Sequence, residues 1–366
     1  MIDENRLIVT FLHLTAIDAE SGDEAEMRAY LTGALAKLGI PSETDDAGNL
    51  FARLPGTRTG DALLFSAHMD TVSPGRGKKA IRHPDGRITS DGTTVLGADD
   101  AAGLAAILES LTVIRERELP HLDVELLFTA EEERFCPGSA RFDYKKLRAK
   151  TAYVLDLTGP VGTAAIAAPT ILSVDVTVRG RAAHAGFAPE DGINALSIAT
   201  GALAGLKTGR VAPDTTVNFG TVEGGTGRNI VPDRIRIAGE VRSLCHETAL
   251  QEARIIEDAF RQVAETLGGA VEVSVTEDLR AYRIAEDEPV VKRLRNALAA
   301  LEMGEPSLVE TFGGSDNNQF VKHGLRGVVL ASAMELVHTV EEYTLVSELV
   351  KSAALTMKLM TLEDDR

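Results

Sequence analysis

The chain has 366 residues with 55 acidic and 38 basic side chains, so its formal net charge is −17 at pH 7. That charge argues against a nucleic-acid backbone or an anionic membrane as a partner. Two cysteines are too few for a disulfide framework, and no apolar run reaches the roughly 20 residues of a membrane span. Because the acidic N-terminus also lacks the basic region of a signal peptide, we expect a soluble, cytoplasmic protein.

The first part of the chain alternates between strand and helix patterns. Apolar spacing predicts a helix over 23–38, strands over 49–54 and 62–67, a polar loop with a short hairpin over 73–94, a helix opening at 97–103, and strands over 124–129 and 152–155. Alternating strands and helices indicate an α/β domain with a largely parallel sheet.

The pattern changes near residue 170. Strands over 171–179, 234–242 and 271–275 alternate apolar and polar residues, which is typical of a sheet with one face in water, and helices over 193–206 and 247–267 lie between them. We therefore predict an inserted α+β domain over 171–277. A helix over 288–302, a strand over 326–331 and a helix over 344–361 return to the α/β pattern, so 1–170 and 278–366 should form one domain.

Polar side chains gather where these apolar strands end. The carboxyl ends of strands in an open α/β sheet meet in one crevice, where ligands bind. The side chains that we expect there are His68, Asp70, Asp99, Glu132, Glu133 and Asp156. His68 and Asp70 share a face if the strand continues. They are either a metal-binding histidine with a carboxylate that fixes its tautomer, or a histidine at the core edge beside a solvated aspartate.

The acidic runs also allow two interpretations. Asp99 and Asp100 at a helix N-terminus are explained by capping and by the helix dipole, although capping accounts for one aspartate better than for two. Glu131–Glu133 is either a charged strand end or a set of like charges that a divalent cation would neutralise. Histidine and carboxylate ligands around open positions suit zinc.

Nine short motifs then follow one another along the chain. They are FSAHMDTV at 65–72, GADDxAG at 97–103, Glu132-Glu133, YVLDxxGPVG at 153–162, AHAG at 183–186, EGGTxxNIV at 223–231, GExRS at 239–243, GGxDxN at 313–318 and VHTxxE at 337–342. In this order they resemble the peptidase T branch of the zinc aminoacylase/carboxypeptidase superfamily.

The resemblance implies two zinc ions, with cobalt or manganese as alternatives, bridged by Asp99. It assigns His68 and Asp156 to the first ion, Glu133 and His338 to the second, the orientation of His68 to Asp70, and the role of general base to Glu132. It further implies a cis peptide bond between Asp99 and Asp100.

For the inserted domain, the resemblance implies a ferredoxin-like lid that also forms a homodimer. It assigns stabilisation of the oxyanion to His184 and substrate binding to Asn229, Arg242, Gly313 and Gly314. The remaining histidines belong to no motif, and we expect structural or surface positions for His13, His83, His121, His246 and His323.

The chain departs from the family pattern at two places. Ala101 stands where the pattern has lysine, and Arg134-Phe135-Cys136 stands where small residues follow the glutamate pair. Cys136 is either a packing thiol or a group close to the metals. The additional Glu131 leaves open which glutamate is the base, and we assign Glu132.

The function that the resemblance implies is a metal-dependent exopeptidase that removes the N-terminal residue from short peptides, as a tripeptidase does. An N-acyl-amino-acid deacylase or a carboxypeptidase of the same superfamily would use the same metals, and a non-catalytic relative that binds small molecules is a third alternative. The expected partners are a short peptide and a second copy of the chain, without nucleic acid or membrane.

Overall fold

A computed structural model describes residues 1–363, which divide into two compact units. Unit 1 comprises residues 1–167, 283–310 and the segment that begins at 315, and unit 2 comprises 168–282 and 311–314. The predicted insertion, 171–277, lies a few residues inside these bounds. The sequence pattern did not assign 311–314 to unit 2, where Gly314 packs so closely against Leu279 and Ile171 that a Cβ would lie 2.1 Å from the Leu279 Cδ1 atom.

The central sheet of unit 1 has nine strands, in the order β1-β2-β6-β3-β7-β16-β8-β14 with β15 beside β8. Their bounds are β1 Ser42–Thr44, β2 Leu50–Leu54, β3 Leu63–His68, β6 Val124–Thr129, β7 Thr151–Leu157, β8 Thr163–Ala168, β14 Tyr282–Arg283, β15 Ser307–Glu310 and β16 Arg326–Ala331. The four central strands β6, β3, β7 and β16 run parallel. Their continuous apolar sequences are buried on both faces, as the prediction of a parallel sheet requires.

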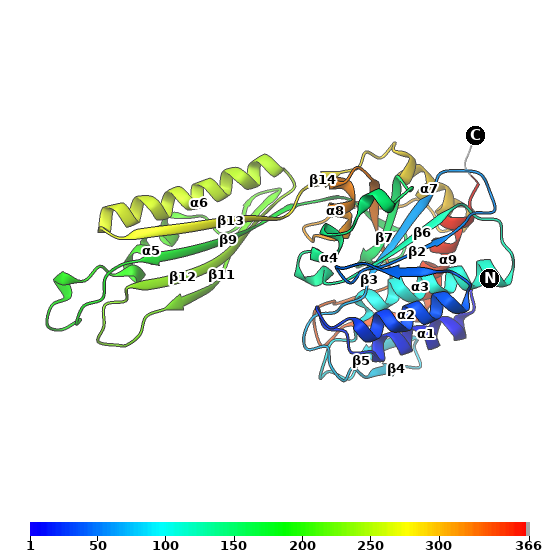
Figure 1. Ribbon diagram of the computed structural model, residues 1–366, viewed down its shortest axis with the longest axis horizontal. Helices are drawn as coiled ribbons and strands as arrows, with labels where there is room; N and C mark the ends of the chain where they lie inside the picture. The colour runs from blue at the N-terminus through cyan, green and yellow to red at the C-terminus, as the bar shows by residue number, and fades with distance from the viewer. Residues whose placement is uncertain (364–366) are drawn as a thin grey trace. The chain divides into compact units, whose positions relative to one another are not determined.

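Helices cover both faces of this sheet (Figure 1). They are α1 Glu4–Ala16, α2 Ala25–Lys37, α3 Ala98–Glu116, α4 Pro137–Ala140, α7 Pro289–Ala300, α8 Asp316–Lys322 and α9 Val346–Thr361. Helices α1, α3 and α9 pack against one another, whereas α8 lies against β7 and β16. Phe320 of α8 joins Leu64 of β3 and Val154 of β7 in a buried apolar cluster.

The polar stretch 73–94 forms the predicted hairpin. Strands β4 (Ala80–Arg82) and β5 (Arg87–Ser90) pair antiparallel, and β17 (Tyr343–Leu345) adds a third strand beside β5. This small sheet connects the loop before α3 to the segment that carries His338.

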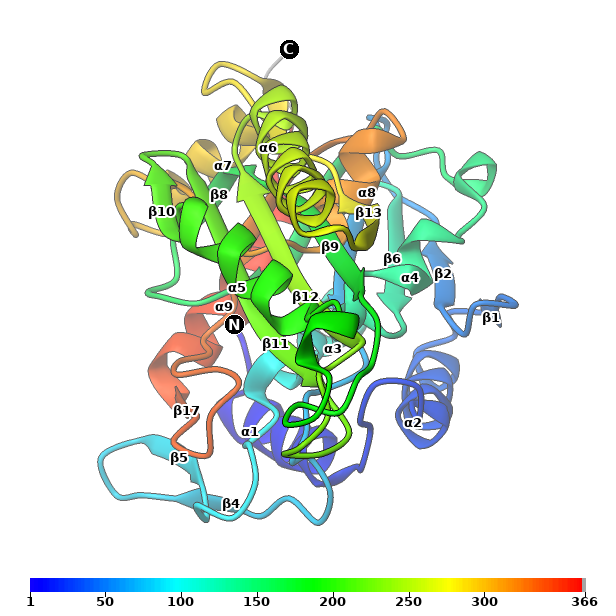
Figure 2. The same cartoon turned by 90° about the vertical axis from the view of Figure 1, so that its left-hand side faces the viewer.

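Unit 2 is one antiparallel sheet with two helices. The strand order is β10-β11-β12-β9-β13, with bounds β9 Thr170–Arg179, β10 Gly209–Ala212, β11 Thr215–Gly224, β12 Arg234–Ser243 and β13 Ala270–Leu279. Helices α5 (Ala195–Gly205) and α6 (His246–Leu267) contact each other and the sheet, and both face the viewer in Figure 2. The inward residues of β9 and Phe260 of α6 form the core, in agreement with the alternating pattern.

The sequence patterns missed several elements, namely α1, α4, α8, β1, β8, β10, β11, β14, β15 and β17. The sequence of β8 is TAAIAA, whose alanines have little preference for strands, and α8 has only seven residues. Within residues 1–363, no helix combines the length and the apolar character that crossing a membrane would require.

Candidate metal centre

Asp99 lies between two histidines from distant parts of unit 1. One carboxylate oxygen, Oδ1, is 2.8 Å from His68 Nε2, and the other, Oδ2, is 3.4 Å from His338 Nε2. Asp99 has extended rather than helical torsions (φ −84°, ψ 99°) at the start of α3, and the peptide bond to Asp100 is cis, as expected. Each oxygen of the carboxylate therefore faces a different imidazole, which is the arrangement that a bridging ligand needs.

Each histidine has a second carboxylate beside it. His338 Nε2 is 2.9 Å from Glu133 Oε2, and His68 Nε2 is 3.9 Å from Asp156 Oδ1. Two groups, His68–Asp99–Glu133 and His68–Glu132–Asp156, bring their ligand atoms within 4.8 Å of one another. All five side chains to which the resemblance assigns metal binding thus meet in unit 1. They lie at the ends of β3 and β7, at the start of α3, and in the segments that follow β6 and β16.

Asp70 connects His68 to the glutamate pair. Its Oδ1 atom is 3.4 Å from His68 Nδ1 and accepts the Glu132 N–H at 2.9 Å, and its Oδ2 accepts the Glu133 N–H at 3.2 Å and the Ser21 hydroxyl at 2.7 Å. Burial acts to raise the pKa of Asp70, but the bonds from His68, Ser21 and Glu132 hold that pKa below its usual value. Asp70 is therefore an anion that fixes the backbone of the glutamate pair and lies beside the imidazole, whose Nδ1 is also 2.9 Å from the Asp70 carbonyl oxygen.

The side chains of Glu131, Glu132 and Glu133 contact different residues. Glu131 lies 3.4 Å from Arg134 and 3.7 Å from Arg141, whereas Glu133 contacts His338 and the buried Glu132 belongs to a group with His68. This geometry favours Glu132 and Glu133 over Glu131 as the functional pair, as assigned from the sequence.

Among residues 1–363, the basic side chains that face the buried negative charge of this cluster are those of His68 and His338. Within residues 1–363, Asp99, Glu132, Glu133 and Asp156 form no ion pair with lysine or arginine. Burial and the charge of Asp156 raise the pKa of Glu132, and burial and the charge of Asp99 raise the pKa of Asp156. Buried like charges are costly without cations among them. With imidazole nitrogens and carboxylate oxygens as donors, the cluster fits a pair of divalent metal ions.

Two further carboxylates hold this centre: Asp100, for which the sequence suggested helix capping, and Glu342, to which it assigned no role. Asp100 accepts the backbone N–H of His68 at 3.2 Å and that of Gly103 at 3.0 Å. Glu342 accepts the N–H groups of Gly97 and Asp99 at 2.7 and 2.9 Å. Burial raises the pKa of Glu342 to about 7. These roles become visible only in the three-dimensional structure, because a sequence motif does not show from which backbone N–H groups a carboxylate accepts hydrogen bonds.

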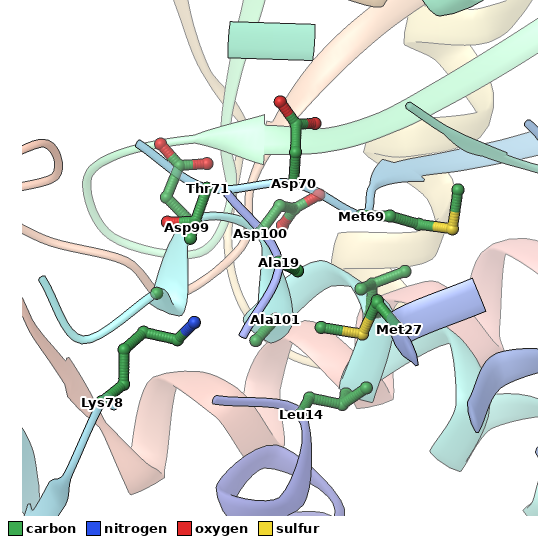
Figure 3. A pocket seen from close by; sticks show the side chains of 12 residues that line it. Leu14, Ala19, Met27, Met69, Asp70, Thr71, Lys78, Asp99, Asp100 and Ala101 are labelled. Atoms are coloured by element: carbon green, nitrogen blue, oxygen red, sulfur yellow. The ribbon is translucent and has the colours of Figure 1, made fainter. Parts of the chain in front are cut away.

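Figure 3 shows the small cavity behind Asp99. Lys78 and Ala101 both line it, and the Lys78 ammonium donates to the Ile17 and Gly75 carbonyl oxygens at 2.7 and 2.9 Å. Burial lowers the pKa of Lys78. A lysine from another segment therefore lies beside the position where the family pattern has lysine and this chain has Ala101.

The residues assigned to the lid lie in unit 2. His184 is exposed, its Nδ1 accepts the Gly186 and Phe187 N–H groups at 3.1 and 3.2 Å, and its ring stacks on Phe187 at 4.2 Å. The Ala185 N–H donates to the Asn229 carbonyl oxygen at 3.0 Å. Unit 2 therefore brings the loops of His184 and Asn229 together.

Arg242 does not present a free guanidinium. It donates to both carboxylate oxygens of Glu240 at 2.9 Å and to the Phe312 carbonyl oxygen at 3.0 Å. Gly313 and Gly314 follow Phe312; Gly314 packs tightly on Leu279, so its lack of a side chain has a structural reason as well.

The other histidines have structural contacts, as expected from the sequence. These contacts are His13 with Tyr30, His83 with Thr89, His121 with the Leu122 carbonyl, His246 with Thr170 and His323 with Tyr144.

Comparison with known proteins supports this description. The family profile of the peptidase dimerisation domain matches residues 166–267, and the profile of peptidase family M28 matches residues 49–185. The crystal structure of aminopeptidase PepT from Bacillus cereus is 39% identical, covers 98% of each chain and gives a TM-score of 0.90. That of a tripeptidase from Staphylococcus aureus is 34% identical, covers 99% of each chain and gives a TM-score of 0.95. The uncharacterized protein YqjE of Bacillus subtilis is 38% identical over 98% of this chain and 99% of its own length.

The fold, the site and these matches define a metallopeptidase whose sequence contains a dimerisation domain. Because relatives above 30% identity cover almost all of it, the chain belongs to the peptidase T-like branch of the M20 peptidase family. The family predicted from the nine motifs is thus confirmed. The fold extends to more distant proteins, including a dinuclear metal binding M20 peptidase of B. subtilis at 17% identity and a TM-score of 0.74.

Proposed function

We propose that this protein is a metal-dependent exopeptidase that removes the N-terminal residue from short peptides. The observation that carries the proposal is the position of Asp99 between His68 and His338, with Glu132 buried beside His68 and, among the described residues, in no ion pair with lysine or arginine. The B. cereus aminopeptidase and the S. aureus tripeptidase support the same reaction class.

The metal ligands that we propose are Asp99 as the bridge, His68 and Asp156 on one side, and Glu133 and His338 on the other. A pair of divalent ions would polarise the scissile carbonyl and lower the pKa of the attacking water. We propose zinc, because imidazole and carboxylate donors with open positions suit it, with cobalt and manganese as alternatives.

Glu132 is the general base in this proposal. Its carboxylate takes one proton from water as the water oxygen bonds to the carbonyl carbon of the first peptide bond. The same proton then passes to the nitrogen of the leaving amine when the C–N bond breaks, so Glu132 returns to its ionised state. Asp70 holds the backbone N–H of Glu132, and so keeps the base at a fixed distance from His68.

The roles of unit 2 remain part of the proposal. His184 would stabilise the oxyanion, Asn229, Arg242, Gly313 and Gly314 would bind the peptide, and unit 2 would form a homodimer. For Arg242 to bind a substrate carboxylate, that carboxylate would have to replace Glu240 as its partner. We also propose a cytoplasmic location, which the free thiols of Cys136 and Cys245 support.

The test compares a tripeptide that has a free amine with the same tripeptide N-acetylated, with zinc, cobalt or manganese present. We expect cleavage of the first peptide bond in the free peptide only. Preferential hydrolysis of the blocked peptide would replace the aminopeptidase proposal by a deacylase, and release of the C-terminal residue would replace it by a carboxypeptidase.

A further inference from the structure

The general base proposed above has a neighbour that the family pattern does not supply. Cys136 Sγ lies 3.4 Å from Glu132 Oε1, and the Cys136 N–H donates to the Glu132 carbonyl oxygen at 2.9 Å. The cysteine side chain is fully buried. One residue therefore contacts both the main chain and the carboxylate of Glu132.

Cys136 belongs to neither group of potential metal ligands within residues 1–363. Burial and the negative charges of Glu132 and Asp316 raise the pKa of its thiol, so the sulfur retains its proton. A protonated thiol can donate a hydrogen bond but is neither a nucleophile nor a good metal ligand. The sequence left two alternatives for Cys136, a packing thiol or a group near the metals. The geometry adds a third, a hydrogen-bond donor to the general base.

A buried polar network lies behind Cys136. Ser139 Oγ donates to Asp316 and lies 3.3 Å from the Cys136 carbonyl oxygen, and Thr129 Oγ1 donates to the other carboxylate oxygen of Asp316. Tyr144 adds a hydrogen bond from its hydroxyl to the Ser139 carbonyl oxygen at 3.0 Å. Asp316, Ser139 and Thr129 are all buried, so the network has little freedom to rearrange.

The conformation of the loop indicates that the backbone holds Cys136 against Glu132. Glu131, Phe135 and Cys136 all have left-handed torsions, with φ of 55°, 66° and 61°. Such torsions in residues other than glycine persist only where surrounding contacts hold them. Here, the bonds from Cys136 to Glu132 and from Ser139 to Asp316 are the contacts that hold the end of the loop.

We propose that Cys136, held in place by Ser139 and Asp316, is a positioning residue that orients the carboxylate of Glu132 through an S–H···O hydrogen bond. With Oε1 engaged by the thiol, Oε2 is the oxygen that takes the proton from water. The inference rests on the proposed function, because it assumes that Glu132 is the base.

Cys136→Ala and Cys136→Ser test the proposal, since serine keeps a donor that alanine lacks. For the alanine variant we expect kcat to fall about 3- to 10-fold, the range of one modest hydrogen bond, with KM and metal content unchanged. The serine variant should stay within about threefold of the wild type, because an O–H donor replaces the S–H donor. Cys245→Ala, which removes the exposed cysteine of unit 2, is the matched control and should leave kcat unchanged.

Equal losses in the alanine and serine variants, or a wild-type kcat in the alanine variant, would overturn the proposal. Ser139→Ala provides a second variant, for which we expect a smaller fall in kcat with KM unchanged; an unchanged kcat would exclude the network as the support of Cys136. Crystal structures of the two Cys136 variants are independent of activity. The carboxylate of Glu132 should have several orientations with alanine and one with serine, and one identical orientation in both would contradict the inference even if no peptide were cleaved.

Discussion

Replacing Asp70 by asparagine should weaken the metal centre although Asp70 is not one of the proposed ligands. Three donors point at its carboxylate: the Ser21 hydroxyl and the N–H groups of Glu132 and Glu133. An asparagine offers one acceptor oxygen, so its NH2 group must face at least one of these donors. Losing a hydrogen bond to a buried charged acceptor costs about 1.5–3 kcal/mol, and such outer partners of metal ligands change metal affinity by about 10- to 100-fold.

Chemical unfolding of the metal-free protein measures the first effect, and competition with a chelator for zinc measures the second. Asp70→Asn should lower both the free energy of unfolding and the zinc affinity by these amounts. Asp46→Asn, at an exposed position outside the site, is the control for losing one negative charge. If Asp70→Asn and Asp46→Asn bound zinc equally well, Asp70 would not orient His68 and the glutamate pair as described.

Three further predictions concern the same unit. Gly97→Ala should lower the free energy of unfolding by about 1–2 kcal/mol or more, because Gly97 has a φ of 74° and the new Cβ would lie 3.1 Å from Lys78 Cε. Gly33→Ala is the control: Gly33 lies inside α2 with open space around it, so alanine should raise the free energy of unfolding by roughly 0.5–1 kcal/mol. His338→Ala should retain fewer metal ions in elemental analysis than His121→Ala, and equal content in both would remove His338 from the ligand set. Zinc at about 100 times its Kd should stabilise the metal-free protein by ~2.7 kcal/mol. An unfolding midpoint that stays the same when zinc is added would contradict the proposed metal site.

Most of the fold was predictable because burial leaves a regular pattern in the sequence. The continuous apolar strands β3, β6 and β16 and the alternating strands β9 and β12 were recognised as such. Helix α1 was not predicted although Leu7, Phe11 and Leu14 have helical spacing, whereas β8 was missed because alanine carries no strong preference for strands. Short edge elements depend on their partners, which a local pattern does not contain.

The site, like the fold, contains residues that the sequence predicted and residues that it did not. His68, Asp99 and His338 stand in recognisable motifs, and the structure brings them together. Glu342 acts through contacts with Gly97 and Asp99, which lie far away in the chain, and no spacing rule identifies such partners. Cys136 contacts Glu132 only four residues before it, but this contact depends on left-handed torsions in the loop that the residue types do not predict. The assignments for His184, Asn229 and Arg242 in unit 2 stay predictions.

The most direct test of the account is a Glu132→Gln variant, measured for metal content and for hydrolysis of a free-amine tripeptide. Glutamine keeps the shape of the side chain but cannot take a proton, and general-base catalysis contributes about 10²- to 10⁴-fold. We predict two metal ions per chain in both the variant and the wild type, with kcat of the variant lowered at least about 100-fold. A Glu132→Gln variant that cleaves the tripeptide at the wild-type rate would contradict the central claim that Glu132 is the base at this metal centre.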